Sequence, residues 1–241
     1  MTLATQRRAL ITGASSGIGK ATALAFAKAG INLALVSRSG EKLAAVASAA
    51  QQSGVEAKAY PLDLADIDVV QAKIRAIAAD FGAIDILVNN AGMGYTGTLS
   101  QTPLCDWLAV MNLNLTSVFQ CIQGILPMMR LQHSGTIINV ASIAAKQAFP
   151  EWGAYSVSKA GLMALSKTLA VEERANGIRV TAICPGAVNS ELWDTETVKL
   201  DFDRAAMLTP ETVAHSILHT ALLPEQAVVE ELTLMPSGGA L

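Results

Sequence analysis

The sequence predicts an α/β protein whose core is a doubly wound parallel sheet of about seven strands with helices on both faces. Short apolar runs alternate with longer amphipathic segments along the whole chain of 241 residues. Some runs, such as residues 86–88, are wholly apolar, which is typical of strands that are covered on both faces. No linker, repeat or low-complexity stretch interrupts the alternation, so we expect one domain over residues 1–241.

The first part of the chain reads as four strands with helices between them. "RALITG" (8–13) predicts a buried strand, and a glycine-rich turn leads from it to a helix over 17–30. "INLALVSR" (31–38) is the second strand, followed by a helix that Gly54 ends. "EAKAYPLDL" (56–64) and "IDILVNNAG" (84–92) are the next strands, with a helix to about residue 81 between them. The alternation of strands and helices predicts parallel strands that are joined by right-handed crossovers.

The second part continues the alternation. We expect a long helix over 105–133, a strand in "GTIINVAS" (135–142), a helix over 155–176 and a strand in "IRVTAICPG" (178–186). Residues 189–208 are too polar and irregular to belong to the core. A helix from about residue 210 and a strand in "VVEELTLMP" (228–236) complete the predicted fold.

Composition narrows the class of protein. The net charge is −3, and no run of like charges favours nucleic acid or an anionic membrane as a partner. Three separated cysteines, Cys105, Cys121 and Cys184, fit neither a disulfide framework nor a metal site, which indicates reduced thiols and a cytoplasmic protein. The start of the chain does not have the pattern of a signal peptide, and no apolar stretch reaches the ~18 residues expected of a membrane span.

The turn after the first strand is a candidate phosphate site. "TGASSGIG" carries Gly13, Gly17 and Gly19, and glycine allows positive φ and a close approach of the backbone to a ligand. The free N–H groups at the start of the following helix suit a pyrophosphate. The spacing is G-x-x-x-G-x-G, and a tight strand–helix turn would explain it equally well when taken alone. Its place after the first strand of a Rossmann pattern favours a dinucleotide.

The end of the second strand predicts which dinucleotide binds. An acidic residue there would accept a hydrogen bond from the ribose of NAD, whereas a cation suits the 2′-phosphate of NADP. Ser37 stands at the likely acid position in "LVSRSGEKL", and Arg38 follows it. We therefore predict NADP(H) as cofactor; a solvated arginine in a loop is the alternative.

"GAYSVSKAGL" places Tyr155 and Lys159 four residues apart, on one face of a helix. Such a pair is common on helix surfaces and alone indicates no chemistry. Histidines 133, 215 and 219 offer no third ligand to a metal, so we expect none. A serine hydrolase would need G-x-S-x-G, which is absent.

Several motifs occur in an order that resembles one family. They are "TGASSGIG", "NNAG", Asn114 in "NLNLTSVF", Ser142 in "IINVASIAA", "YSVSK" and "PG" at 185–186. Together, over essentially the whole chain, they resemble the NAD(P)-dependent short-chain dehydrogenase/reductase family in its ~250-residue form. The resemblance implies that Tyr155 is the catalytic acid/base and that Lys159 lowers its pKa and holds the nicotinamide ribose. It also implies that Ser142 orients the substrate carbonyl.

The resemblance assigns the remaining site residues as well. Asn114 would support a proton relay through Lys159 and water. The implied cofactor residues are Gly13, Ser15, Ser16, Gly17, Ile18, Gly19, Ser37, Arg38, Asp63, Leu64, Asn90, Tyr155, Lys159, Pro185, Gly186, Val188 and Ser190. Family members are commonly tetramers paired through their two long helices, so a homotetramer or dimer is expected.

The substrate is left open by the sequence. We expect a lid over about 187–208, with Trp193 either closing on substrate or packed beneath the lid. Gly94, Tyr95, Ala144, Phe149 and Trp152 are candidates for the rest of an apolar pocket that suits a neutral ketone. The ending "LTLMPSGGAL" resembles that of NADP-dependent carbonyl or 3-hydroxy acid dehydrogenases, and it lacks the "DGG" that is usual in 3-oxoacyl-carrier-protein reductases. We therefore expect NADP-dependent carbonyl reduction to a secondary alcohol, with a 3-oxoacyl-carrier-protein reductase as the alternative. A nucleotide-sensing protein without catalysis is the remaining possibility.

Overall fold

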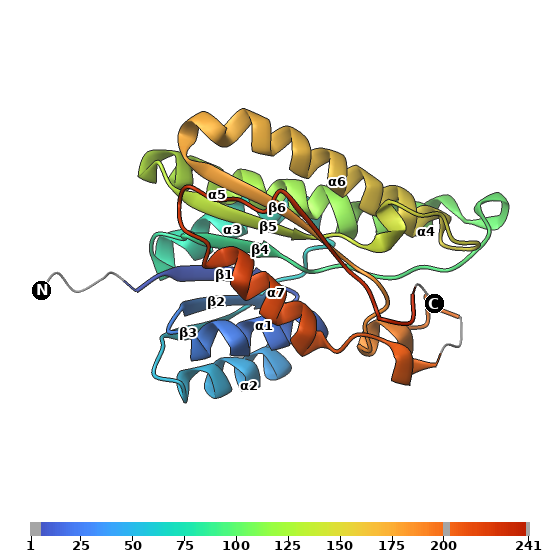
Figure 1. The fold of residues 1–241 in the computed structure, drawn as a ribbon, viewed down its shortest axis with the longest axis horizontal. Coiled ribbons are helices and arrows are strands. Elements are labelled where there is room, and N and C mark those ends of the chain that lie inside the picture. The colour runs from blue at the N-terminus through green and yellow to red at the C-terminus, as the bar shows by residue number, and fades with distance from the viewer. Residues whose placement is uncertain (1–5, 200–202, 240–241) are drawn as a thin grey trace, which may run out of the picture.

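A computed structural model describes residues 6–199 and 203–239 and confirms the predicted fold class. Seven parallel strands form one sheet in the order β3-β2-β1-β4-β5-β6-β7 (Figure 1). The strands are β1 (Arg8–Thr12), β2 (Asn32–Ser37), β3 (Ala57–Pro61), β4 (Ile86–Asn89), β5 (Gly135–Val140), β6 (Ile178–Pro185) and β7 (Glu231–Leu234). Each lies inside its predicted range.

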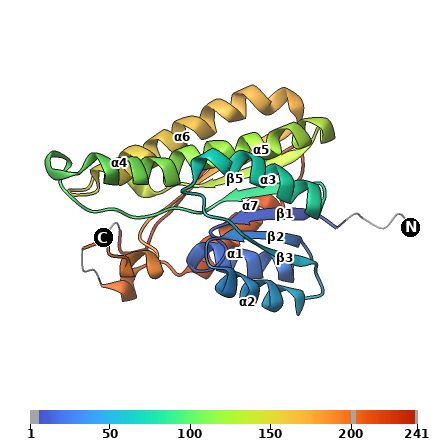
Figure 2. The ribbon, with the colours of Figure 1, turned by 180° about the vertical axis from the view of Figure 1, so that it is seen from behind.

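Helices cover both faces of the sheet (Figures 1 and 2). On one face lie α1 (Gly17–Lys28), α2 (Gly40–Gln51) and α7 (Pro210–Ala221), with α1 packed between the other two. On the other face lie α3 (Ile67–Phe81), α4 (Leu104–Met111), α5 (Ser117–Gln132) and α6 (Gly153–Glu173). This arrangement buries successive strand residues on opposite sides, so Leu10 belongs to the core under α3 and α5 and Ile11 to the core under α1.

The strand order places a ligand site at the centre of the sheet. From β1 the chain winds outward through β2 and β3, and then returns to pair β4 with the other side of β1. Ile11 of β1 is in register with Val88 of β4, so both strands end at the same level. The loops that follow them diverge to opposite faces, and a ligand crevice is expected outside the carboxyl ends of two such strands.

The predicted helix over 105–133 is interrupted. Between α4 and α5 the backbone forms a π-helical turn over Asn112–Thr116. The extra residue in that turn changes which side chains face the sheet, and π-turns of this kind often occur at functional sites. From the sequence we predicted one continuous helix here and missed the interruption.

The same segment also corrects an expectation about membranes. By length and composition, Leu104–Gln132 qualifies as a membrane-spanning helix, whereas we expected no stretch to do so. Core helices of soluble proteins pass the same test, and 44% of the most apolar window is buried within the structure. Packing of α5 on α3 and β5 accounts for the buried apolar residues of this helix.

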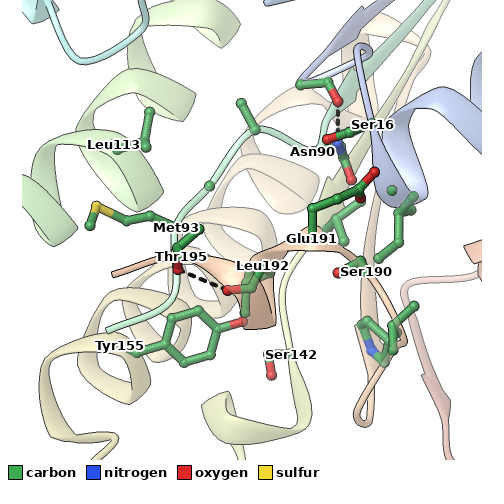
Figure 3. A pocket seen from close by; sticks show the side chains of 18 of the residues that line it. Ser16, Asn90, Met93, Leu113, Ser142, Tyr155, Ser190, Glu191, Leu192 and Thr195 are labelled. Carbon is green, nitrogen blue, oxygen red and sulfur yellow. Dashed lines mark hydrogen bonds between the residues drawn. The ribbon is translucent and has the colours of Figure 1, made fainter. Parts of the chain in front are cut away.

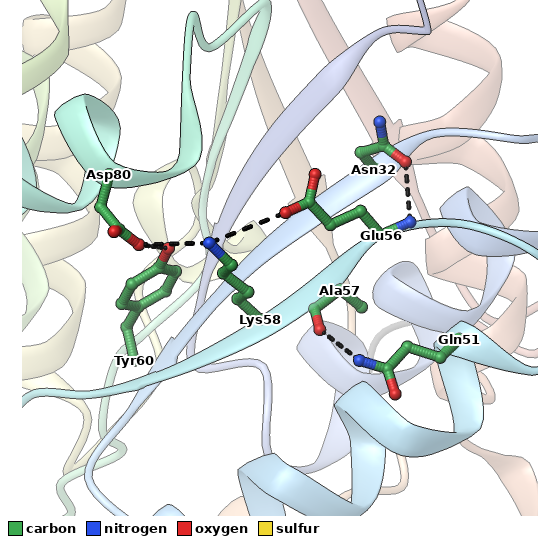
Figure 4. Close-up of polar contacts among 7 residues, drawn as sticks. All are labelled: Asn32, Gln51, Glu56, Ala57, Lys58, Tyr60 and Asp80. Atoms are coloured by element: carbon green, nitrogen blue, oxygen red, sulfur yellow. Dashed lines mark hydrogen bonds and ion pairs between the residues drawn. The ribbon is translucent and has the colours of Figure 1, made fainter.

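Charged side chains occupy the outer edge of the sheet at β3 (Figure 4). The Lys58 ammonium nitrogen lies 3.7 Å from a carboxylate oxygen of Glu56 and 3.5 Å from a carboxylate oxygen of Asp80 on α3. The Tyr60 hydroxyl donates a 2.6 Å hydrogen bond to the Asp80 carboxylate. Charges on an edge strand discourage pairing with another sheet. This cluster lies outside the residues that line the cavity described below, and we assign it to protection of the edge.

Candidate active site

A cavity of about 730 Å³ opens at the carboxyl ends of the central strands (Figure 3). Its walls come from the turn after β1, the ends of β2 to β6 and the segment after β6. The lining contains every predicted cofactor residue except Gly19: Gly13, Ser15, Ser16, Gly17, Ile18, Ser37, Arg38, Asp63, Leu64, Asn90, Tyr155, Lys159, Pro185, Gly186, Val188 and Ser190. Residues separated by up to 177 positions in sequence (13 to 190) therefore share one space.

Glycines at the start of α1 shape one end of the cavity. Gly13 and Gly17 have φ of +63° and +50°, a region that favours glycine. Gly19 is buried, and a side chain there would collide with the Gly13 carbonyl oxygen, 2.2 Å from an added Cβ. Gly19 thus allows the turn to pack on the helix and does not line the cavity. The side chain of Ser16, the N-cap residue of α1, makes no capping hydrogen bond, and the first turn of α1 carries no acidic residue.

Asn90 holds this turn against the end of β4. Its side-chain nitrogen donates to the carbonyl oxygens of Thr12 and Gly13, at 3.0 and 3.3 Å. The Thr12 hydroxyl accepts in return from the backbone N–H groups of Asn90 and Ala91, at 3.0 and 3.1 Å. These bonds fix the loops that follow β1 and β4 relative to each other, as a preformed ligand site requires.

Polar and basic side chains line the cavity where β2 ends. Ser37 is buried, and its hydroxyl has no hydrogen-bond partner among the described residues. Arg38 beside it is exposed, and Lys42 of α2 lines the same space. Our sequence reading missed Lys42, although its place in the first turn of a helix that follows Arg38 was a usable signal. A buried unpaired hydroxyl beside two cations suits a phosphorylated ribose.

Three predicted catalytic side chains meet at the opposite end. Tyr155 and Lys159 project from α6, and Ser142 follows β5. The buried Lys159 ammonium donates to the Val140 carbonyl oxygen at 2.8 Å and lies 5.7 Å from the centre of the Tyr155 ring. The Ser142 hydroxyl accepts from the Ala144 N–H at 3.1 Å. Figure 3 shows the Tyr155 phenol and the Ser142 hydroxyl facing the same space.

Burial sets the titration of both groups on α6. Desolvation raises the pKa of Tyr155 above its ordinary value, and the hydrogen bond with Ser142 opposes the shift. Desolvation lowers the pKa of Lys159 to about 8. Burial is the largest influence on the Tyr155 pKa in this structure, and the lowering of that pKa by Lys159 stays a prediction. Tyr155 stays protonated through the neutral range, as a proton donor must.

Asn114 lies behind the cavity and does not line it. It is fully buried in the π-helical turn, where its side-chain oxygen accepts from the Met93 N–H at 2.8 Å. Its side-chain nitrogen donates to the Met93 carbonyl oxygen and to the Ser158 hydroxyl, at 2.9 and 3.1 Å. Asn114 thus joins the loop after β4 to α6, next to Lys159. Its proton-relay role stays a prediction.

The wall near Tyr155 is largely apolar. Of the predicted pocket residues, Ala144, Phe149 and Trp152 line the cavity, together with Trp193, Leu192 and Met93. Gly94 and Tyr95 do not. A side chain on Gly94 would lie 2.7 Å from Val198, so this glycine lies beneath the segment after β6, and Tyr95 donates to Asp106 at 3.0 Å instead.

Glu191 is a further lining residue that our sequence reading did not single out. Its carboxylate lies against the start of α1, since a methyl group on Gly17 would be 3.6 Å from Glu191 Oε2. Figure 3 shows its side chain extending toward Ser16. A negative charge at a helix N-terminus is favourable, and a phosphate would take the same place.

Comparison with known proteins identifies the family. The model of the short chain dehydrogenase family matches residues 7–200. The chain belongs to this family. A 3-oxoacyl-[acyl-carrier-protein] reductase of Synechocystis sp. is 37% identical, with 99% of this chain and 98% of the relative aligned. A sepiapterin reductase of Chlorobaculum tepidum is 36% identical over 95% of this chain and 96% of its own.

Solved structures agree with this assignment. The alcohol dehydrogenase of the archaeon Thermococcus sibiricus, solved with 5-hydroxy-NADP, superposes with a TM-score of 0.88 at 29% identity and covers 96% of this chain and 97% of its own. This short-chain dehydrogenase is therefore an oxidoreductase that acts on carbonyl or alcohol groups. The described residues contain no group of three or more His, Cys, Asp or Glu side chains placed to hold a metal.

The residues of this short-chain dehydrogenase fit a nicotinamide dinucleotide. The uncapped N-terminus of α1 suits a diphosphate, and the unpaired Ser37 hydroxyl suits the adenosine ribose. The space between them and Tyr155 is continuous within one cavity. A cofactor held at both of these points would have its other end beside Ser142 and Tyr155.

Proposed function

We propose that this short-chain dehydrogenase reduces a ketone to a secondary alcohol with NADPH, reversibly, and that Tyr155 is the acid. One observation carries the proposal. Tyr155, Ser142 and Lys159 occupy the same cavity as the glycine turn and the Ser37–Arg38 pair. A dinucleotide long enough to bridge the two ends would place its nicotinamide next to a proton donor, which is the arrangement that carbonyl reduction needs.

Each catalytic side chain would have one task. NADPH, when bound, would supply a hydride to the carbonyl carbon. Ser142 orients the carbonyl oxygen by a hydrogen bond, and Tyr155 gives its proton to that oxygen as negative charge develops. The buried Lys159 ammonium would stabilise the phenolate that remains until solvent restores the proton. Asn114 positions the loop and helix around these groups through Met93 and Ser158.

Several features support NADP(H) over NAD(H). The end of β2 carries Ser37 and no carboxylate, so nothing there would repel a 2′-phosphate. Arg38 and Lys42 line the cavity beside it and provide two cations. The similar alcohol dehydrogenase of Thermococcus sibiricus was solved with an NADP derivative.

The test of the proposed function is Tyr155→Phe, assayed by NADPH oxidation with a panel of ketones. Loss of the proton donor should lower kcat about 100-fold or more while NADPH still binds. Ser156→Ala, one residue along the same helix, is the matched control and should retain activity. Near-native turnover by a folded Tyr155→Phe protein with bound NADPH would refute the assignment.

The alternative substrate is a 3-oxoacyl thioester on acyl-carrier protein, favoured by the identity with the Synechocystis sp. reductase. Including an acetoacetyl thioester in the panel shows whether the enzyme prefers a simple ketone or a 3-oxoacyl thioester. NADPH binding without turnover of any carbonyl would instead indicate a nucleotide-sensing protein.

We further propose that the protein is a cytoplasmic homotetramer and that residues 1–241 form one domain. We also propose a substrate lid over about 187–208, of which residues 200–202 lie outside the described residues.

A further inference from the structure

Two tryptophans from distant segments form one wall of the cavity beside Tyr155. Trp152 directly precedes α6, and Trp193 lies in a short 3₁₀ turn over Glu191–Asp194 after β6. Their ring centroids are 5.8 Å apart with the planes at 71°. Trp152 also meets the Tyr155 ring edge-on, at 5.1 Å and 68°. The three rings thus form a continuous aromatic surface that ends at the proton donor.

A hydrogen bond holds the Trp193 indole in place, and burial holds the Trp152 indole. Trp193 donates its ring N–H to the Val188 carbonyl oxygen at 2.8 Å. Trp152 is almost completely buried and forms a backbone bridge with Gly97, whose N–H donates to Glu151 at 2.7 Å. Rings that are already ordered lose little conformational entropy when a ligand packs against them.

Charges around this wall disfavour an anionic substrate. Among the described lining residues, the cations are Arg38 and Lys42 at the β2 end and Lys159 at the catalytic end. Lys159 already donates to Val140, and the carboxylate nearest this end is Glu191. Within the part of the lining that the structure describes, no guanidinium lies at this end and the one ammonium is already a donor, so desolvating a substrate carboxylate would go uncompensated.

We infer that the Trp152–Trp193 wall selects neutral ketones that carry a flat apolar group next to the carbonyl. This inference rests on the proposed carbonyl reduction and names its substrate class. With the carbonyl oxygen between Tyr155 and Ser142, the neighbouring substituent extends along the indole surfaces. Trp193 belongs to the segment after β6, so binding of such a group also stabilises that segment over the site.

Three probes separate the features of the substrate. Ethyl benzoylformate is neutral and aromatic, ethyl pyruvate is neutral and small, and benzoylformate is aromatic and anionic. We expect kcat/KM for ethyl benzoylformate to exceed that for each of the others about ten-fold or more. In Trp193→Ala the preference for the aryl ester over ethyl pyruvate should fall about ten-fold, and Trp193→Phe should restore most of it.

Trp107→Phe is the matched control, because Trp107 lies on α4 outside the cavity lining and its loss should leave the preference unchanged. Equal kcat/KM for the two neutral esters, or an unchanged preference in Trp193→Ala, overturns the inference while Tyr155-dependent turnover preserves the proposed function. Faster turnover of benzoylformate than of its ester also overturns it. If no probe gives turnover that depends on Tyr155, both this inference and the proposed function are overturned.

Discussion

At the scale of single residues, Tyr155 and Lys159 illustrate how burial and bonding decide the use of a side chain. The two residues stand one helical turn apart, a spacing that is common on exposed helices. Here Lys159 is buried and bonded to the end of β5, and Tyr155 faces Ser142. The residue types could be read from the sequence. The rise in the Tyr155 pKa on burial could not, because it depends on the depth of the side chain in the folded structure.

Cofactor choice is also a matter of single side chains. Arg38→Ala removes a cation that would pair with the 2′-phosphate, and Ser37→Asp adds a carboxylate that repels it. Each change should raise KM for NADPH about ten-fold and leave KM for NADH within about two-fold, or lower it in Ser37→Asp. Steady-state kinetics with both cofactors measure the shift.

Lys28→Ala serves as the control for that experiment, since it removes the same charge from the far end of α1. A preference for NADPH that survives both Arg38→Ala and Ser37→Asp would contradict the role assigned to the end of β2. An equal rise in KM for NADPH and for NADH would instead indicate that the substitution damages the fold.

At the scale of elements, the structural features that neighbouring residues in the sequence determine could be predicted, whereas those that depend on tertiary packing could not. All seven strands and the glycine turn follow from short apolar runs and their neighbouring residues. The π-helical turn at Asn114 did not, since it involves packing of α4 and of the turn itself on α6 and the hydrogen bonds of Asn114 with Met93. Lys42 and Glu191 were missed for a related reason: each reaches the cavity from an element whose orientation only the tertiary structure defines.

The segment after β6 interacts with α1 through Glu191. Its carboxylate lies at the helix N-terminus, where the diphosphate of a cofactor would bind. Binding of the cofactor must therefore displace the Glu191 carboxylate or occur despite its repulsion of the diphosphate. Glu191→Gln should bind NADPH about three- to five-fold more tightly, as measured by titration calorimetry.

Glu196→Gln is the control, because it removes the same charge from an exposed position of the same segment outside the cavity lining. NADPH affinity should not change in this variant. Equal or weaker NADPH binding by Glu191→Gln would show that the carboxylate does not compete with the cofactor.

At the scale of the whole molecule, one helical layer carries most of the large apolar side chains that are exposed among the described residues. Six of the large apolar side chains that are exposed among the described residues lie on α4, α5 and α6: Leu104, Leu108, Phe119, Leu131, Val157 and Val171. These helices form one layer over the sheet (Figure 2). The layer as a whole could be predicted from the β–α alternation, but the identity of its outward residues depended on helix register and on the π-turn.

We expect this layer to pair with the same layer of a second copy, in accordance with the proposed tetramer. Phe119→Asp together with Val157→Asp places charges on α5 and α6 where apolar surface would be buried, so the mass measured by light scattering should fall from that of a tetramer to that of a dimer or monomer. Ala49→Asp adds a charge to an exposed position of α2 on the opposite face of the sheet and should leave the mass unchanged. A monomeric wild-type protein, or a double variant that remains tetrameric, would show that α5 and α6 do not form the interface.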